Sequence, residues 1–300
     1  MYDIIIIGGG PAGMTAAIYG RRAAKKVLVL EALSCGGQII NTPDIENYPV
    51  EEHISGIDFS NRLHKQAENL GAEFVFEKAV DINDLGDSKE VITAKNTYTA
   101  KAVIIATGSA NRKLGLENED SLVGRGVSYC ATCDGNFYRN KTVAVVGGGN
   151  TALEDALYLS DIAAKVYLIH RRDSFRGEEA NAAKLSEKPN IEFVLNSNVT
   201  ALNAEKRLKS VEVTNKDGSV RTLEVNGLFI AVGRIPENMN FARLVELDEA
   251  GYIPAGENCH TGVPGIYAAG DNRAKEVRQL VTAVSDGAVA ATEVVKYING

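Results

Sequence analysis

The chain has 300 residues, 45% of them hydrophobic, which is enough for two ordinary domains or one large α/β domain with a real core. Its 32 basic and 39 acidic residues leave a net charge of −7, which argues against a protein that binds nucleic acid by neutralising phosphates. The N-terminus has no basic region, and no apolar stretch approaches membrane-spanning length. Four cysteines are too few for a disulfide scaffold. These features predict a soluble cytoplasmic protein.

The first predicted element is the apolar run 4–7, which leads into the glycine turn 8–13 (GGGPAG). Because this run is apolar without alternation, it predicts a strand that is buried on both faces of a parallel sheet. A helix should follow the turn, and a second apolar run, 27–30, then ends at Glu31. This succession of strand, glycine turn, helix and strand is the βαβ unit that binds dinucleotides.

The same unit recurs 139 positions further along the chain. The apolar run 143–146 leads into GGGNTA (147–152), and the run 166–169 ends at His170, the counterpart of Glu31. Each copy is followed by another apolar run that closes on a glycine, Gly108 in the first copy and Gly233 in the second. Agreement over a whole unit predicts two domains of the same kind.

A last apolar run, 266–269, ends in Gly270 and Asp271 without a preceding glycine fingerprint, so we expect it to return to the first domain. The polar segments 111–120 and 234–240 are the expected crossings between domains. The predicted fold class is α/β, with two Rossmann-like, three-layer dinucleotide-binding domains, the second inserted in the first. The first domain comprises residues 1–112 and 244–300, and the inserted domain comprises residues 113–243.

The residue that ends the second strand of each unit predicts which nucleotide binds. Glu31 can accept hydrogen bonds from a ribose diol, which fits a nucleotide without a 2′-phosphate, such as FAD or NAD. At the matching place the second unit carries Arg171, Arg172 and Arg176, whose guanidinium groups suit the 2′-phosphate of NADP(H). The alternative is a solvated basic patch. The sequence therefore predicts FAD in the first domain, NADPH in the inserted domain and hydride transfer into a flavin.

Cys130 and Cys133 lie just before the second fingerprint, and the two residues between them allow a reversible disulfide. The small Ala131 and Thr132 would let another group approach closely. Asp134 can serve as acid or base if burial raises its pKa. Half of a zinc site and an inert packed pair remain alternatives, although no second CxxC is present. Beside a flavin, the dithiol completes a path from nicotinamide to disulfide.

The remaining cysteines and histidines carry little signal. Cys35 follows Glu31 and can lie close to the first nucleotide, although packing is its simpler role. We assign no function to the others: Cys259, His260, His53 and His64.

Together, these motifs resemble those of the low-molecular-weight, NADPH-dependent thioredoxin reductases over essentially the whole chain. The matching motifs are GxGxxG at 8–13, GGQ at 36–38, CATCD at 130–134, the turn with Asn150, HRRxxxR at 170–176, GD at 270–271 and RQL at 278–280. The resemblance implies a homodimer that passes electrons from NADPH through FAD and the Cys130–Cys133 pair to oxidised thioredoxin. It also implies that Cys133 faces the flavin, Cys130 attacks the partner and Asp134 is the acid.

Fingerprints and resemblance together define the expected binding residues. Those expected to contact FAD are Gly8, Gly10, Pro11, Ala12, Gly13, Glu31, Gly36, Gly37, Gln38, Asn47, Gly108, Gly270, Asp271, Arg278, Gln279 and Leu280. Those expected to contact NADPH are Gly147, Gly149, Asn150, Thr151, His170, Arg171, Arg172, Arg176 and Gly233. No metal is expected.

Three rival functions remain. The first is a relative that takes its electrons from ferredoxin, against which the arginine element argues. The second is a ferredoxin–NADP reductase of the same fold, which would not need the CxxC. The third is a sensor in which flavin and dithiol report the redox state without turnover.

Overall fold

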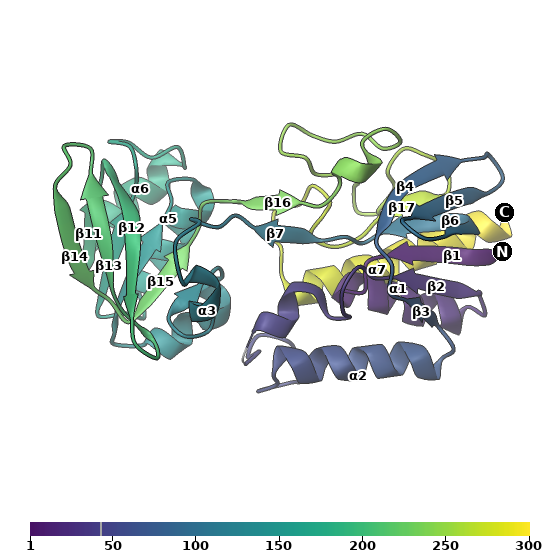
Figure 1. Cartoon of the computed structure of the whole chain (residues 1–300), viewed down its shortest axis with the longest axis horizontal. Coiled ribbons are helices and arrows are strands. Elements are labelled where there is room, and N and C mark those ends of the chain that lie inside the picture. The colour runs from purple at the N-terminus through teal and green to yellow at the C-terminus, as the bar shows by residue number, and fades with distance from the viewer. Residues whose placement is uncertain (43) are drawn as a thin grey trace. The chain divides into compact units, whose positions relative to one another are not determined.

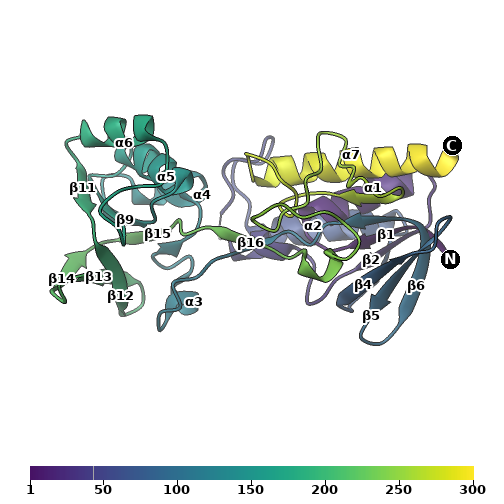
Figure 2. The same ribbon diagram turned by 90° about the horizontal axis from the view of Figure 1, so that it is seen from above.

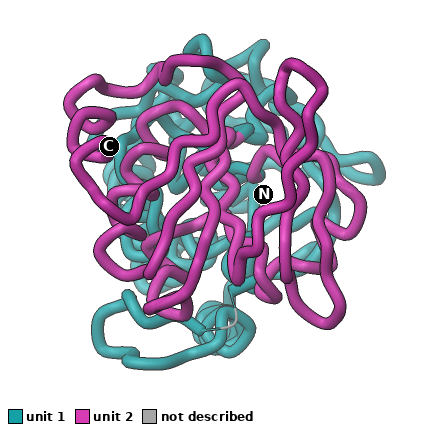
Figure 3. Tube along the Cα trace, turned by 90° about the vertical axis from the view of Figure 1, so that its left-hand side faces the viewer, with its two compact units in different colours: residues 1–110, 235–300 teal, residues 111–234 magenta. Residues whose placement is uncertain are grey.

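The computed structural model describes residues 1–42 and 44–300, which form two compact units. Unit 1 comprises residues 1–110 and 235–300, and unit 2 comprises residues 111–234 (Figure 1, Figure 3). Both are built on a sheet whose central strands are parallel, with helices on one face, so the predicted α/β fold class is confirmed. Among the described residues, no helix has both the length and the apolar character needed to cross a bilayer.

Unit 1 contains a seven-stranded sheet. Strands β3, β2, β1 and β6 lie side by side and parallel; β17 pairs in parallel with the end of β6, and β5 and β4 continue the sheet in antiparallel fashion. The strands are β1 (Tyr2–Ile7), β2 (Val27–Leu30), β3 (Glu73–Val75), β4 (Ala79–Asp84), β5 (Lys89–Thr93), β6 (Thr97–Ile105) and β17 (Ile266–Ala268). The late apolar run 266–269 thus joins the sheet that the N-terminal strand belongs to.

Three helices cover one face of this sheet (Figure 2). They are α1 (Pro11–Arg22), α2 (Gly56–Asn69) and α7 (Leu280–Asn299), and two short 3₁₀ segments are η1 (Gly37–Asn41) and η3 (Met239–Phe241). Ile4 and Ile6 of β1 pack against these helices, whereas Ile5 and Ile7 pack in a second core on the other face. Burial on both faces explains why the run 4–7 has no polar member.

Unit 2 has three layers. Its five-stranded parallel sheet has the order β11-β10-β9-β15-β8, with helices on one face and the antiparallel sheet β12-β13-β14 on the other (Figure 2). The strands are β8 (Val127–Ser128), β9 (Thr142–Val146), β10 (Lys165–Ile169), β11 (Ile191–Val194), β12 (Ser197–Ala204), β13 (Leu208–Asn215), β14 (Val220–Glu224) and β15 (Gly227–Ile230). The helical elements are α3 (Glu119–Leu122), α4 (Ala131–Asp134), η2 (Gly135–Tyr138), α5 (Asn150–Ser160) and α6 (Glu179–Ser186).

The internal repeat of the sequence is reproduced in the hydrogen bonds of the two units. The Gly8 amide donates to the Leu30 carbonyl at 2.8 Å, and the Gly147 amide donates to the Ile169 carbonyl at 3.1 Å. Both glycines have positive φ, and a side chain on either would collide with the carbonyl oxygen that follows the neighbouring strand, β6 or β15. Each fingerprint therefore needs glycine at its first position for the same steric reason.

The chain returns to unit 1 earlier than the sequence predicts. The crossing segments β7 (Ser109–Asn111) and β16 (Arg234–Pro236) pair with each other (Figure 1). Residues from 235 onwards belong to unit 1, whereas the predicted boundary lies at 244. The reason is burial: Asn238 is fully buried and donates to the Gly251 and Asn272 carbonyls, and Phe241 packs in the unit 1 core. Because the segment 234–240 is polar, the sequence predicted an exposed crossing there rather than a buried part of unit 1.

Val50 is strained in a tight turn, with a φ of +81° and a fully exposed side chain. A β-branched residue is disfavoured in this backbone region, and this one gains no burial in return. We expect Val50→Gly to raise the free energy of unfolding by about 1 kcal/mol, because relief of strain outweighs the added freedom of the unfolded chain. Urea unfolding followed by circular dichroism measures the change. Val50→Ala, which keeps a Cβ, should gain less, and a less stable glycine variant would contradict the prediction.

Candidate functional site

The glycine turn between β1 and α1 gathers the N-terminal residues of the first candidate site. Gly10 precedes α1 and no side chain caps the helix, so its first N–H groups are available to a ligand. The Gly36 amide donates to the Gly9 carbonyl at 2.8 Å, and a Cβ built on Gly37 would lie 3.4 Å from the Gly10 Cα. The loop 36–38 therefore lies directly on the turn 8–13.

Glu31, at the end of β2, is also part of this turn. Its Oε2 accepts from the Gly9 amide at 2.6 Å and its Oε1 accepts from the Leu33 amide at 2.9 Å. Each carboxylate oxygen keeps a further lone pair, so both can still accept from a ribose diol. Cys35 lies close by, with its Sγ 3.1 Å from where a Cβ on Gly9 would be. Burial and the Glu31 charge raise the pKa of this thiol to about 12, so it stays protonated and unreactive at neutral pH.

The C-terminal segment packs on the same turn. A Cβ on Gly270 would lie 2.9 Å from the Cβ of Ala12, and a side chain on Gly287 of α7 would collide with the Ala12 carbonyl. Gly270 and Asp271 follow β17, and Gly108 follows β6. Because β1, β6 and β17 are parallel neighbours, these residues share one edge of the sheet with the glycine turn. The fold thus brings residues from both ends of the chain to one site.

The RQL segment at the start of α7 is tied to Asn47, which lies in the segment before α2. Asn47 Nδ2 donates to Gln279 Oε1 at 3.2 Å. The Arg278 guanidinium lies 4.1 Å from the centroid of the Tyr252 ring, and its buried Nε has no hydrogen-bond partner among the described residues. Leu280, by contrast, packs in the small apolar cluster around Ile45, Ile54 and Phe59.

A buried charge cluster that the sequence did not reveal holds Gly270 in place. Asp286 of α7 accepts hydrogen bonds from the Gly270 amide at 2.9 Å, from Arg273 Nη2 at 2.7 Å and from Lys275 Nζ at 2.8 Å. Burial alone would raise the pKa of Asp286, but the hydrogen bonds from Arg273 and Lys275 outweigh it and hold that pKa below its usual value. No spacing rule joins residues 270, 273, 275 and 286, so only the fold reveals this cluster.

We expect Asp286→Asn to lower the free energy of unfolding by about 3–5 kcal/mol at pH 7, because Arg273 and Lys275 would stay buried without their carboxylate. Since the folded pKa lies below the unfolded one, the stabilisation is complete above about pH 4 and is lost as the pH falls through the folded value. Urea unfolding at several pH values should show the wild type and the variant converging in acid. Glu293→Gln, on the same helix and in a surface ion pair with Lys296, is the control and should change little.

The second glycine turn joins β9 to α5. Gly149 precedes α5. Among the described residues, no side chain caps the helix and no atom lies within 4 Å of where a Cβ on Gly149 would be. The Gly148 carbonyl accepts from the Arg176 amide at 2.7 Å and from the Gly177 amide at 3.1 Å. Asn150 Oδ1 accepts from the Glu178 amide at 2.8 Å. The arginine loop is therefore fastened directly over the open start of the helix.

The side chains of this loop combine exposed charge with one buried ring. Arg171, Arg172 and Arg176 are exposed. His170 is buried, its ring lies against Gly148, and its Nε2 has no hydrogen-bond partner among the described residues. Burial and the three neighbouring arginines lower the pKa of His170, so the ring is neutral at pH 7 and the positive charge of the site comes from the arginines. Thr151 lies in the first turn of α5, and Gly233 follows β15 at the same sheet edge.

The cysteine pair forms a disulfide in unit 2, with the Cα atoms 5.3 Å apart. Cys130 precedes α4 and Cys133 lies within it, so the pair opens a single helical turn. Both cysteines are partly buried and Thr132 is exposed. Ala131, however, is buried in the core beneath the helices, so the expectation that it leaves room for an approaching group is wrong. Thr132, rather than Ala131, is the residue between the cysteines that is exposed.

Asp134 lies one residue after the pair and is bonded to a serine that the sequence analysis missed. Ser128 Oγ donates to Asp134 Oδ2 at 2.6 Å, while Asp134 Oδ1 is buried and has no hydrogen-bond partner among the described residues. Burial raises the pKa of Asp134, and the Ser128 hydrogen bond opposes this shift only in part. A carboxyl with a raised pKa keeps its proton to a higher pH than an exposed aspartate, so Asp134 can donate and accept protons next to the disulfide. Ser128 belongs to no recognised sequence motif. Its position two residues before Cys130 is the only feature of the sequence that indicates this contact.

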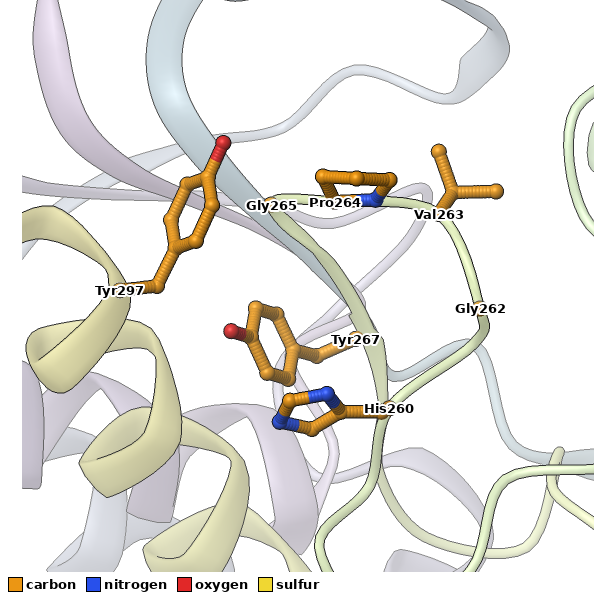
Figure 4. Close-up of a pocket in the computed structure, with 7 residues that line it drawn as sticks. All are labelled: His260, Gly262, Val263, Pro264, Gly265, Tyr267 and Tyr297. Atoms are coloured by element: carbon orange, nitrogen blue, oxygen red, sulfur yellow. The ribbon is translucent and has the colours of Figure 1, made fainter.

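A separate pocket of about 280 Å³ lies in unit 1, between the loop 260–265 and the end of α7 (Figure 4). The His260 ring stands edge-on to the Tyr267 ring at 4.7 Å, and His260 Nε2 lies 3.4 Å from Glu293 Oε2. Tyr297 of α7 closes the far side. None of the predicted nucleotide-binding residues lines this pocket.

Comparisons with known proteins agree with this arrangement. Residues 2–287 match the family model described as pyridine nucleotide-disulphide oxidoreductase. The thioredoxin reductase of Listeria innocua is 43% identical over 300 residues, covering 99% of this chain and 94% of that protein, and that of Bacillus subtilis is 42% identical over 301 residues, covering 99% and 95%. The crystal structure of thioredoxin reductase from Streptococcus pyogenes matches with a TM-score of 0.95 and 40% identity, covering 100% of this chain and 98% of that one. The chain therefore belongs to the pyridine nucleotide-disulphide oxidoreductases and, within them, to the thioredoxin reductase family.

Proposed function

We propose that this chain is an NADPH-dependent flavoenzyme that reduces the disulfide of thioredoxin. The observation that carries the proposal is the Cys130–Cys133 disulfide beside a half-buried Asp134, in the same unit as the arginine-bearing fingerprint. A nucleotide-binding protein without redox chemistry at sulfur would not need this pair. Relatives at 42–43% identity over the whole chain carry the name thioredoxin reductase, which supports the choice of acceptor.

Unit 1 fits FAD. The start of α1 offers N–H groups to a pyrophosphate and Glu31 offers acceptors to a ribose. The buried Arg278 Nε is a donor that has no partner among the residues the structure describes. Bound there, FAD would supply the two-electron relay between a nicotinamide and a disulfide. The role of the chain is to hold the nucleotide between the turn 8–13, the loop 36–38 and the segment after β17.

Unit 2 fits NADPH. Gly149 leaves open space at the uncapped start of α5, as a pyrophosphate requires. Arg171, Arg172 and Arg176 are exposed on the loop fastened over it, where a 2′-phosphate can accept charge-assisted hydrogen bonds. A carboxylate in place of His170 would repel that phosphate, which is why the two units bind different nucleotides.

The dithiol carries the electrons onward. Two electrons and two protons convert the Cys130–Cys133 disulfide into two thiols. The Cys130 thiolate then attacks the thioredoxin disulfide to form a mixed disulfide, and Cys133 attacks Cys130 to release reduced thioredoxin and restore the internal disulfide. Asp134 holds the protons that the departing sulfurs need. The homodimer and the cytoplasmic location expected from the resemblance belong to the same proposal, and sedimentation of the holoenzyme tests the first of them.

An anaerobic NADPH titration of the purified holoenzyme, followed by addition of oxidised thioredoxin, tests the proposal. The flavin absorbance should bleach with NADPH and recover when thioredoxin is added. A flavin that only reduced ferredoxin bleaches would assign the donor to ferredoxin. Recovery that persists in Cys133→Ser would favour a reductase that does not use the CxxC, and bleaching without any protein-disulfide turnover would favour a sensor.

A further inference from the structure

Ser128 occupies a position from which its hydroxyl reaches three polar atoms of the dithiol segment. It is a buried residue of β8. Its Oγ lies 2.6 Å from Asp134 Oδ2, 3.1 Å from the Cys130 amide nitrogen and 3.3 Å from the Cys130 carbonyl oxygen. A serine hydroxyl has one hydrogen and two lone pairs, so it cannot donate to the Asp134 carboxylate and the Cys130 carbonyl at the same time. Two arrangements of the same atoms are therefore possible.

The first arrangement suits an ionised Asp134. The hydroxyl donates to Asp134 Oδ2 at the short distance of a charge-assisted hydrogen bond and accepts from the Cys130 amide. The second suits a protonated Asp134. The carboxylic acid then donates to Ser128 Oγ, the Cys130 amide still donates to it, and the hydroxyl hydrogen turns to the Cys130 carbonyl. In both arrangements each buried donor finds an acceptor, so neither protonation state leaves a donor unsatisfied.

We propose that Ser128 is a positioning residue whose hydroxyl rotates between Asp134 and the Cys130 carbonyl, so that Asp134 keeps a hydrogen bond to Ser128 both with and without its proton. The inference rests on the proposed function, in which Asp134 handles the protons of the dithiol. Asp134 Oδ1 is buried and has no hydrogen-bond partner among the described residues.

The proton count shows why both states are needed. The reduced form begins with a Cys130 thiolate, a Cys133 thiol and a protonated Asp134. When the Cys130 thiolate attacks the partner disulfide, the leaving sulfur takes the proton of Asp134. Asp134 next removes the proton of Cys133, which attacks Cys130, and it passes that proton to the second leaving sulfur. Two protons and two electrons reach the partner, and Asp134 ends as the carboxylate that the oxidised form requires.

Among the residues the structure describes, no neighbouring charge shifts the pKa of Asp134 as burial and Ser128 do. The two causes that set its pKa are burial and Ser128. Tyr138 of η2 is the nearest titratable neighbour on its own segment, and burial followed by the Asp134 charge raises the pKa of Tyr138 to about 12, so it stays neutral. Helix α5, which packs against α4, carries Asp155 and Tyr158. Burial and Glu154 raise the pKa of Asp155 to about 7, so its own titration must be followed separately.

The test follows the carboxyl carbon of Asp134 by ¹³C NMR in the oxidised holoenzyme labelled at Asp Cγ, with Asp134→Asn and Asp155→Asn to identify the two resonances. In Ser128→Ala we expect the midpoint of Asp134 to rise by about one pH unit, because the carboxylate loses the hydrogen bond from Ser128 that favours its ionised form. Ser128→Thr keeps the hydroxyl and should restore the wild-type midpoint. Ser210→Ala removes another buried serine hydroxyl, on β13, and should leave the midpoint unchanged.

The wild type gives a second readout that does not depend on a variant folding. Because the hydroxyl turns when Asp134 is protonated, the amide shift of Cys130 should titrate with the same midpoint as the Asp134 carbon. An unchanged midpoint in Ser128→Ala, an equal shift in Ser128→Thr, or a Cys130 amide that ignores the titration would each overturn the proposal. Full thioredoxin turnover by Asp134→Asn would instead refute the role of Asp134 as the acid in the proposed function. The NMR result would still decide the role of Ser128.

Discussion

Cys130→Ser will leave the flavin reducible by NADPH and reduce thioredoxin turnover by at least about 10³-fold, the scale on which loss of a covalent nucleophile acts. The variant keeps the nucleotide sites of both units, since Cys130 lies outside both glycine turns. It removes the sulfur that would attack the partner disulfide, and serine is far too weak a nucleophile at neutral pH to replace it. Flavin absorbance under anaerobic NADPH and the rate of thioredoxin reduction measure the two steps separately.

The matched control is Cys259→Ser, at a buried thiol outside the dithiol segment. Burial and Asp286 raise the pKa of Cys259 to about 11, so it is unreactive at neutral pH, and turnover should stay within about twofold of wild type because the swap changes little volume. A Cys130→Ser enzyme that still turns over thioredoxin would remove Cys130 from the mechanism. A flavin that NADPH no longer bleaches in this variant would show that the pair also shapes the nucleotide site.

Replacing Arg171 and Arg172 together by alanine will lower kcat/KM for NADPH by on the order of a hundredfold and leave kcat/KM for NADH nearly unchanged. Each arginine can give the 2′-phosphate a charge-assisted hydrogen bond worth about 1.5–3 kcal/mol, and NADH has no such phosphate. The loop backbone should survive, because it is held by the Gly148 carbonyl rather than by these side chains. Steady-state kinetics with the two cofactors at fixed thioredoxin measures the ratio.

Arg221→Ala is the control for the loss of a surface arginine in unit 2. Arg221 lies on β14 in an exposed ion pair with Glu192, and its removal should affect both cofactors equally and weakly. Equal large losses for NADPH and NADH in the double variant would refute the assignment of the 2′-phosphate to Arg171 and Arg172.

Much of the fold follows from local patterns. The runs 4–7 and 143–146 are uniformly apolar because each strand is buried on both faces. Every residue of each run must therefore be apolar, and this is visible in the sequence. The glycine turns can also be recognised from the sequence, because a positive φ and a nearby carbonyl leave no room for a side chain at Gly8 or Gly147. The CxxC and the arginine element are likewise read from residue type and spacing within one segment.

Other features depend on residues that are distant in sequence. Asp286 meets Gly270, Asn47 meets Gln279, and the polar stretch around Asn238 is buried in unit 1 rather than exposed in a linker. Whether a polar residue is a solvated surface group or a satisfied buried one depends on which partner the packed chain supplies, and one sequence does not contain that information. Ala131 is another example. Its small size suggested that a group could approach the disulfide beside it, but in the folded chain Ala131 is buried.

The sequence by itself therefore determined the fold class, the internal repeat and the chemistry of the dithiol, because each depends on periodicity or on spacing along the chain. Only the tertiary structure decided where the chain re-enters unit 1, what anchors Gly270 and how Asp134 is hydrogen-bonded. Those contacts form when strands and helices pack, and their partners are chosen by three-dimensional proximity. Ser128 depends on both sequence and tertiary structure. It lies two residues from Cys130 in the sequence, but its proposed role depends on the turn that brings Asp134 within hydrogen-bond distance.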